Sequence, residues 1–386
     1  MPGATDDIFY KHLNRVDDDY AVFGELAWDI RPNLTLTAGG RYFQVVNSLL
    51  GFSGFASNAN NPAVCFPSTA ITQVPCVDVN HQVNEEGETH KLNLSWKVDP
   101  QKLLYLTYST GFRPGGVNRL ALAPPYNPDT LANYEFGWKT SWLDGSLRVN
   151  GAIFDEEWKG VQYALEPPGL QGLTIIANAG NARSYGLEGD VTWRATENLT
   201  LSVSGTALHA RLTTDFCNFN KAGVATGCAP KGTKLPVQPD YKLNASARYD
   251  FTLADFKSFV EGDLQAQGSS NSQLFTADEA ATGPTPPFGT VDLSAGFGKD
   301  NWTFSIFAQN LFDKRGELSI STDCAVAICG AFPIDYLTKP RFIGAKISAK
   351  FTCMPSRRDS ISAYSATLAS VCRSCATTRG SSRRAT

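Results

Sequence analysis

Six of the nine cysteines occur as three close pairs, each within one polar, Gly- and Pro-rich segment. The pairs are Cys65 with Cys76, Cys217 with Cys228, and Cys324 with Cys329. Thiols at this spacing can form disulfides in an oxidising compartment, and each bond would restrict its segment. No Cys/His set in residues 1–351 has the spacing of zinc ligands. We therefore predict disulfides within loops and no metal site.

Paired carboxylates stand beside an aromatic ring at Asp155, Glu156, Glu157 and Trp158, a combination that glycoside hydrolases use. Adjacent strand residues point to opposite faces, so Asp155 and Glu156 do not flank one bond. Asp155 and Glu157 can share a face, which in a barrel would be the lumen. The sequence has no phosphate-binding P-loop, GxSxG turn or HExxH motif. We predict neither an enzyme nor a bound cofactor.

Three polar residues, Arg113, Asn118 and Arg119, lie where an expected strand passes into a long polar segment. They are candidates for contact with an anionic ligand. The alternative for such arginines is pairing with acidic neighbours or with lipopolysaccharide phosphates. Likewise, His81 and His90 flank acidic residues that suit either a cation site or a solvated loop edge.

Alternation of apolar and polar residues indicates the elements that carry these groups. Tyr134, Phe136 and Trp138 share one face of a strand, with Glu135 and Lys139 on the other. Charged residues make up 18% of the chain, below the roughly 25% of soluble domains. No stretch reaches the ~20 apolar residues of a membrane helix, and a barrel would hide its apolar signal in period-2 alternation.

Short turns and long polar segments alternate along the chain, which is typical of a transmembrane barrel with unequal rims. We predict an all-β antiparallel barrel wall of about thirteen strands. The expected strands are 18–30, 34–50, 83–98, 102–112, 130–143, 146–164, 178–195, 199–212, 239–252, 256–268, 288–298, 301–316 and 340–351.

Five stretches in order resemble the barrel of TonB-dependent outer-membrane receptors. They are Tyr105–Gly116, Asn133–Lys139 with the following Leu143–Gly151, Asn178–Gly189, Gln309–Lys314, and Pro340–Phe351. The resemblance implies a Gram-negative outer-membrane receptor with a 22-strand barrel around a plug. It also implies energy-coupled uptake of a scarce large ligand, by family default a ferric siderophore. The expected partners are outer-membrane lipid, lipopolysaccharide, the TonB complex and the barrel-assembly machinery.

The last expected strand resembles the family's terminal strand with its closing aromatic residue. One face carries the residues of a barrel-assembly signal: Ile343, Ala345, Ile347, Ala349 and Phe351. An odd strand count, with no secretion signal at Met1, leads us to expect that the plug, the TonB contact and about nine strands are missing. We therefore expect residues 1–351 to be the C-terminal part of a barrel that does not transport by itself.

Residues 352–386 have a different composition, with six Arg, one acidic residue and no alternation. We expect a disordered Ser/Arg-rich tail, such as a shifted reading frame past Phe351 would produce. A basic tail can bind nucleic acid or anionic lipid, but we expect no nucleic-acid partner. Two alternatives remain for the whole chain: a passive porin, which needs no plug, and a secreted soluble β-rich carbohydrate-binding protein.

Overall fold

The computed structural model describes residues 9–55, 64–65, 69–70, 79–120, 123–165, 174–219, 225–322 and 332–350. The chain divides into two units, Met1–Ser348 and Ala349–Thr386. The predicted tail lies outside the described residues. No helix in the described ranges is long and apolar enough to cross a membrane.

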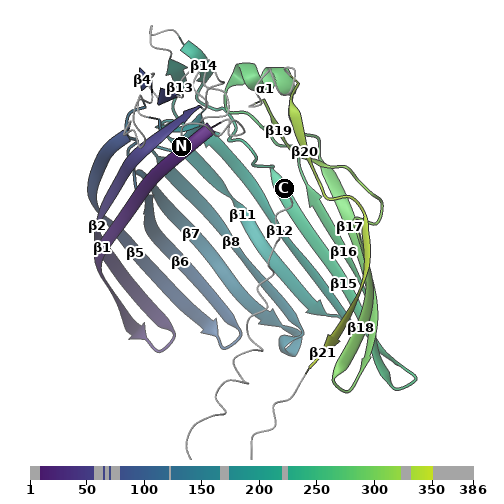
Figure 1. Ribbon diagram of the computed structural model, residues 1–386. Coiled ribbons are helices and arrows are strands. Elements are labelled where there is room, and N and C mark those ends of the chain that lie inside the picture. Colours follow the sequence, from purple (N-terminus) through teal and green to yellow (C-terminus); the bar gives the residue numbers. More distant parts are fainter. Residues whose placement is uncertain are drawn as a thin grey trace, which may run out of the picture. The chain divides into compact units, whose positions relative to one another are not determined.

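The first unit is built on one curved antiparallel sheet (Figure 1). It has fifteen strands within the described residues; β3 and β4 contribute two residues each, which leaves thirteen long strands. These are β1 Phe9–Arg31, β2 Leu34–Phe55, β5 Val79–Asp99, β6 Lys102–Arg113, β7 Asp129–Trp142, β8 Leu147–Lys159, β11 Ala182–Arg194, β12 Leu199–Leu212, β15 Tyr241–Leu253, β16 Phe256–Gln267, β17 Phe288–Lys299, β18 Trp302–Gln309 and β21 Phe342–Ala349. The predicted all-β architecture is confirmed.

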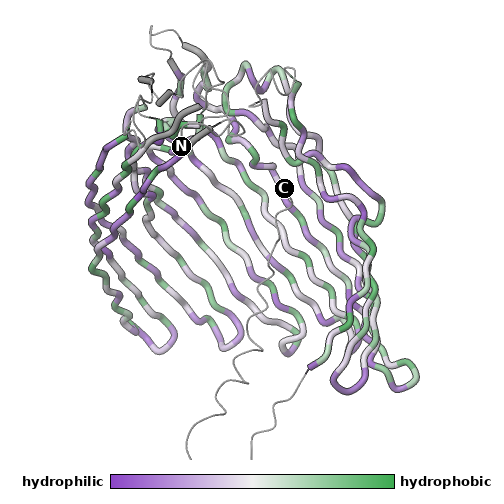
Figure 2. The backbone as a smooth tube through the Cα atoms, viewed as in Figure 1, coloured by the Kyte–Doolittle hydropathy of each residue, from purple (hydrophilic) through white to green (hydrophobic). Residues whose placement is uncertain are grey.

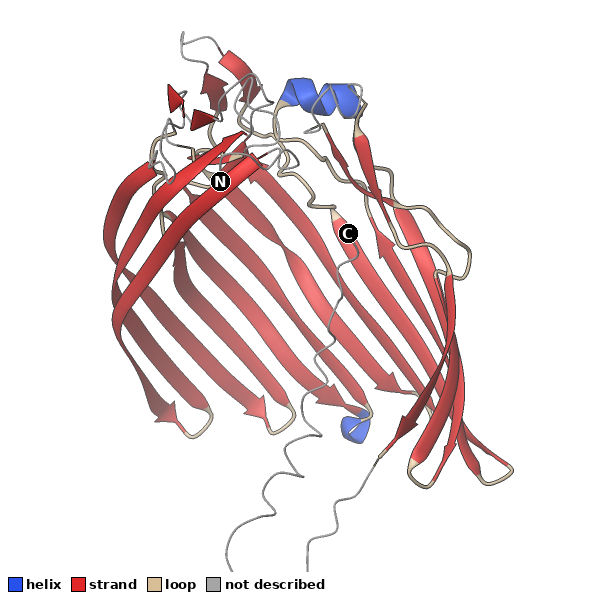
Figure 3. Cartoon of the chain, viewed as in Figure 1, coloured by secondary structure: helices blue, strands red, loops and turns tan. Residues whose placement is uncertain are grey.

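Tight turns join the long strands at one edge of the sheet, as the sequence predicts (Figure 3). Several turn residues adopt the left-handed conformation that reverses a strand in few residues, among them Asp144, Asp255 and Asp300. The opposite edge carries the long connections. In a transmembrane barrel of the kind that the sequence predicts, short turns face the periplasm and longer loops face outward, so we expect the turn edge to be the periplasmic one.

The long connections contain secondary structure that alternation did not predict. The additional elements are β3 Val64–Cys65, β4 Thr69–Ala70, β9 Gln162–Leu165, β10 Ile175–Asn178, β13 Phe216–Phe219, β14 Ala225–Ala229, α1 Thr276–Thr282, β19 Glu317–Ser321 and β20 Ile334–Leu337. Three hairpins form, β9 with β10, β13 with β14, and β19 with β20. The expected strands at 146–164 and 178–195 are therefore shorter in the structure. The strand expected at 301–316 ends at Gln309, because the chain turns at Asn310.

The two faces of the sheet differ in chemistry, as the alternating hydropathy along each strand indicates (Figure 2). Val191, Val203 and Ala245 lie side by side on the apolar face of β11, β12 and β15. In the adjacent pair of the β11–β12 ladder, Asp190 lies opposite Ser204 on the polar face. One face of each strand is therefore suited to hydrocarbon and the other to water.

A single asparagine holds the junction between β17, β18 and the segment before β21. Asn310 has a left-handed backbone and is 5% exposed. Its side-chain amide donates to the carbonyls of Lys314 and Lys339, at 2.9 and 2.8 Å. Nearby, the backbone N–H of Arg341 lowers the pKa of Asp313 below its usual value, with Arg315 adding to the effect.

An arginine should lower the stability of the sheet much more on the apolar face than on the polar face. Val203→Arg places a cation toward lipid near mid-strand and should cost about 2–4 kcal/mol, because the hydrocarbon cannot solvate it. Ser204→Arg on the polar face should cost far less. Urea unfolding in phospholipid vesicles, followed by tryptophan fluorescence, measures both variants. An equal loss in the two would contradict the assignment of the faces.

Candidate functional site

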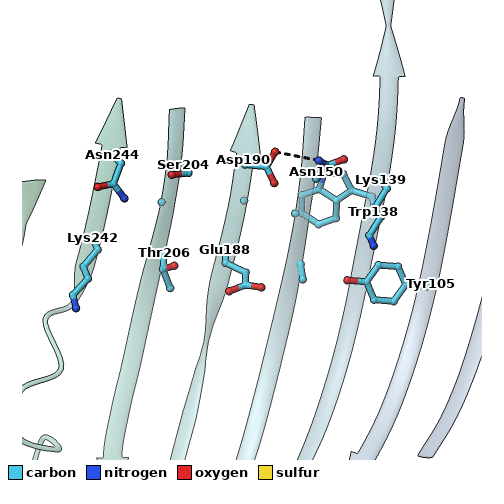
Figure 4. Close-up of a pocket in the computed structure, with 14 residues that line it drawn as sticks. Tyr105, Trp138, Lys139, Asn150, Glu188, Asp190, Ser204, Thr206, Lys242 and Asn244 are labelled. Atoms are coloured by element: carbon cyan, nitrogen blue, oxygen red, sulfur yellow. Dashed lines mark hydrogen bonds between the residues drawn. The ribbon is translucent and has the colours of Figure 1, made fainter. Parts of the chain in front are cut away.

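The polar face carries a band of hydrogen-bonding side chains across β6 to β15 (Figure 4). A recess of about 460 Å³ opens on this band. We call it the polar wall, and its polar residues are Tyr105, Lys139, Asn150, Glu188, Asp190, Ser204, Thr206, Lys242 and Asn244. Each long strand contributes alternate residues, so strand register alone aligns the band.

Both charge signs occur on the polar wall, which suits a hydrated or polar surface more than an apolar one. Asn150 donates a hydrogen bond to Asp190 at 3.1 Å. Lys139 lies 6.0 Å from the ring centroid of Tyr105. These side chains present donors and acceptors but no nucleophile paired with a base. The wall can bind or guide a polar partner, and its geometry does not indicate bond-breaking chemistry.

Three carboxylates, Glu135, Glu156 and Glu188, line a second recess of about 340 Å³ nearer the outer loops. They come from β7, β8 and β11, and Trp158 lies beside them. The described residues contain no group of acidic, His or Cys side chains arranged to hold a metal ion. This recess therefore gives the polar face an acidic region without forming a coordination site.

Asn118, a predicted ligand contact, has a structural role here. It is 5% exposed, and its side chain forms the two hydrogen bonds to the Ile176 backbone that a neighbouring strand would form. Its side-chain oxygen accepts from the Ile176 N–H at 2.7 Å, and its amide donates to the Ile176 carbonyl at 2.9 Å. The residue thereby fixes the segment after β6 to the β9–β10 hairpin.

Arg113, the second predicted contact, binds an acidic neighbour, which is the alternative that the sequence left open. Its guanidinium donates to Asp129, whose side chain is 2% exposed, and lies 5.0 Å from the ring centroid of Trp158. Asp129 also accepts from the backbone N–H of Gln162 at 3.1 Å. Arg113 is half exposed, so it still presents charge to the outer rim.

Arg119 differs from the other two because its pairing is incomplete. One terminal nitrogen donates to the Thr174 hydroxyl at 3.2 Å, while the buried Nε has no partner among the described residues. The three predicted contacts thus lie in one region, but two of them are engaged in holding it together.

Side chains of the polar face anchor this same segment from beneath. Asn47 accepts from the N–H of Val117 at 2.9 Å, and Glu85 accepts from that of Gly115 at 2.8 Å. Arg15 donates to the carbonyl of Val117 at 2.7 Å. Sequence reasoning missed these anchors; their one available signal was polar residues at polar-face positions near strand ends.

An apolar cluster joins several outer connections into one body. The buried members are Val161, Ala179, Ala182, Leu212, Ala229 and Leu274. Cys217 and Cys228 are disulfide-bonded across the β13–β14 hairpin. Phe216 of this hairpin stacks on Phe275 beside α1, and the Thr276 hydroxyl donates to the Cys228 carbonyl. The disulfide therefore reinforces a hairpin that packs into this cluster.

The remaining candidates do not converge. Cys65 is described only as backbone of β3, and Cys76, Cys324, Cys329 and Phe351 lie outside the described residues. His90 pairs with Glu88 at 3.4 Å on the face opposite Glu85. In the described part of the chain, no group of His, Cys and acidic side chains is arranged there to hold a metal ion.

The sequence prediction that Asp155 faces a lumen is wrong. Register places it beside Tyr185, on the face of Val191, where it accepts from Arg183 at 2.8 Å.

A family model, TonB dependent receptor-like, beta-barrel, matches residues 5–311. The chain belongs to the TonB-dependent receptor β-barrel family. Members are transporters of the Gram-negative outer membrane and not enzymes, so the polar face is the lumen side and the apolar face meets lipid.

Individual relatives are named as receptors. The chain is 27% identical over 246 residues to the metal-pseudopaline receptor CntO of Pseudomonas aeruginosa, which covers 62% of this chain and 31% of the relative. It is 23% identical over 243 residues to the pesticin receptor of Yersinia enterocolitica, covering 60% and 32%. The chain thus spans about a third of the length of the curated relatives it matches.

Solved structures support the same fold. The ferric yersiniabactin uptake receptor FyuA from Yersinia pestis matches with a TM-score of 0.68 and 17% identity, covering 88% of this chain and 46% of that one. The siderophore receptor PiuA from Acinetobacter baumannii matches with a TM-score of 0.63 and 17% identity, covering 87% and 43%.

We predict that Asn118→Ala loosens the β9–β10 hairpin. Ile176 would lose a side-chain acceptor in a buried place, which costs about 1–3 kcal/mol. Hydrogen exchange at the Ile176 amide should therefore accelerate about tenfold or more, as read by mass spectrometry. Asn84→Ala is the control, because Asn84 is exposed and accepts a local hydrogen bond from the Gln82 side chain. Unchanged exchange at Ile176 would refute the role of Asn118.

The disulfide has a direct chemical test. Digestion of unreduced, outer-membrane-derived protein should release the peptides of Cys217 and Cys228 as one linked species. Reduction should separate them. Alkylation of both thiols in the untreated protein would contradict the bond.

Proposed function

We propose that the chain forms part of an outer-membrane receptor that takes up a metal ion bound to a small organic chelator, a siderophore. The observation that carries this proposal is the polar wall, which runs along the lumen side beneath packed outer loops. Such a wall accommodates a hydrated solute or a polar protein surface. The names of the relatives favour metal–siderophore complexes, with the ferric complex as the first candidate.

Energy coupling to the TonB complex belongs to the same proposal. Because the chain matches about a third of its relatives' length, we propose that uptake also requires the parts of those receptors outside the matched region. The 386-residue chain expressed by itself is then expected not to transport. A passive channel is the competing function, and it would need no TonB.

Further partners follow from the position in the membrane. We propose that the half-exposed Arg113 and the partly buried Arg119 at the outer rim meet anionic ligand or lipopolysaccharide phosphates. The exposed Ile343 and Ile347 of β21 support a signal read by the barrel-assembly machinery. We also keep Cys65–Cys76 and Cys324–Cys329 as proposed disulfides.

Uptake of radiolabelled metal in the native host tests the function. Deletion of the gene should abolish accumulation of iron supplied with at least one siderophore of a chemically diverse panel. A plasmid that carries the complete receptor locus should restore it, whereas a plasmid that encodes the 386 residues alone should not. Deletion of tonB should remove the restored uptake, because uptake against a gradient needs energy. Copper, zinc and nickel complexes extend the panel.

Two results would contradict the proposal. Unchanged accumulation of every complex after gene deletion would exclude metal–siderophore uptake. Accumulation that depends on the gene but not on tonB would favour the passive channel.

A further inference from the structure

A groove of about 390 Å³ opens on the lipid-facing side of the sheet at its periplasmic edge. Its lining residues come from β15, β16, β17 and β18. Figure 1 shows these four strands running side by side to their tight turns. Large apolar side chains line it, chiefly Phe251, Leu253, Val260, Phe297, Phe304 and Ile306. Leu253 and Ile306 are 65% and 53% exposed, so the groove is open to the membrane.

Strand register explains why a groove forms at this place. Ser258 pairs with Phe297, and Ala295 pairs with Val260, so two small residues lie diagonally between two large ones. The Ser258 hydroxyl donates to the carbonyl of Phe256 at 3.3 Å. The small side chains of Ser258 and Ala295 therefore leave a depression between the large ones. The Ser258 hydroxyl is already hydrogen-bonded within the chain.

Aromatic rings and a cation close the turn end of the groove. Phe256, Phe297 and Trp302 pack edge to face, with centroid separations of 5.6, 6.0 and 5.8 Å. The Lys299 ammonium lies 5.6 Å from the Phe256 centroid and is exposed. Aromatic rings of this kind mark the membrane–water boundary in barrels. Lys299 thus stands at the depth of lipid phosphates.

Acidic residues near this cation lie in the turns. Asp255 and Asp300 are exposed and have left-handed backbones. Within the described residues neither forms an ion pair with Lys299. The ammonium is therefore available to an anion that arrives from the membrane side.

We propose that the groove binds one phospholipid of the periplasmic leaflet, with an acyl chain between the large side chains and the phosphate against Lys299. The surrounding lipid is as apolar as the groove, so the hydrophobic effect gives no preference for this position. The preference comes from close packing of the chain over Ser258 and Ala295, and from the charge of Lys299. Lipopolysaccharide is excluded as the occupant because it lies in the other leaflet.

Filling the groove tests the acyl-chain contact. Native mass spectrometry of the detergent-purified protein, titrated with dioleoylphosphatidylglycerol, gives the affinity. Ala295→Phe should weaken binding about tenfold, the change that corresponds to roughly 1.4 kcal/mol. Ala247→Phe is the matched control, because Ala247 is exposed on the same face, outside the groove.

Removing the charge tests the phosphate contact. Lys299→Gln should weaken phosphatidylglycerol binding about fivefold and leave binding of uncharged dioleoylglycerol unchanged. Lys257→Gln is its control, since Lys257 lies at the same edge on the lumen side. Heat-modifiable gel migration confirms that each variant is folded.

Equal affinities for Ala295→Phe and Ala247→Phe would overturn the acyl-chain site. Equal affinities for Lys299→Gln and Lys257→Gln would overturn the phosphate contact and with it the proposal. The proposed lipid site depends on the location of the chain in the outer membrane and not on the identity of the transported ligand. Failure of the uptake experiment would therefore leave this result unaffected.

Discussion

The structure depends on one constraint: a backbone that lies in lipid must satisfy its hydrogen bonds within the protein. The long antiparallel ladders meet this requirement, and β1 with β2 pairs from Phe9 to Arg31 with one register shift, at its turn end. Once the ladders are fixed, alternate residues of each strand are assigned to lipid or to lumen. The polar wall and the apolar groove are both consequences of that assignment.

The same register places function on one face and anchoring to the membrane on the other. Asn150, Asp190 and Ser204 come from separate strands and still form one band on the lumen side. Phe256, Phe297 and Trp302 meet in the same manner on the lipid side. Neither group requires a loop to position it, because neighbouring strands set both spacing and direction.

The outer connections follow a different rule, since water can satisfy the backbone groups that their short hairpins leave unpaired. Their order comes from the apolar cluster around Leu212 and Leu274, from the Cys217–Cys228 disulfide, and from side chains that pair with backbone. Asn118 and Asp129 are of the last kind. A residue type that suits ligand contact, such as Arg113, is in this way used for internal pairing, while its half-exposed charge still faces the rim.

The sequence by itself determined the strands, the short turns and the two faces. Hydropathy that alternates with a period of two is a local property of neighbouring residues and does not depend on distant ones. The structure confirms thirteen long strands, with the largest difference in β1, which begins at Phe9 instead of near residue 18. Only the tertiary structure decided that Asn118 pairs with Ile176 and that small residues leave a groove above Lys299. Those outcomes depend on which distant residues register and loop packing bring together, and local alternation carries no information about that.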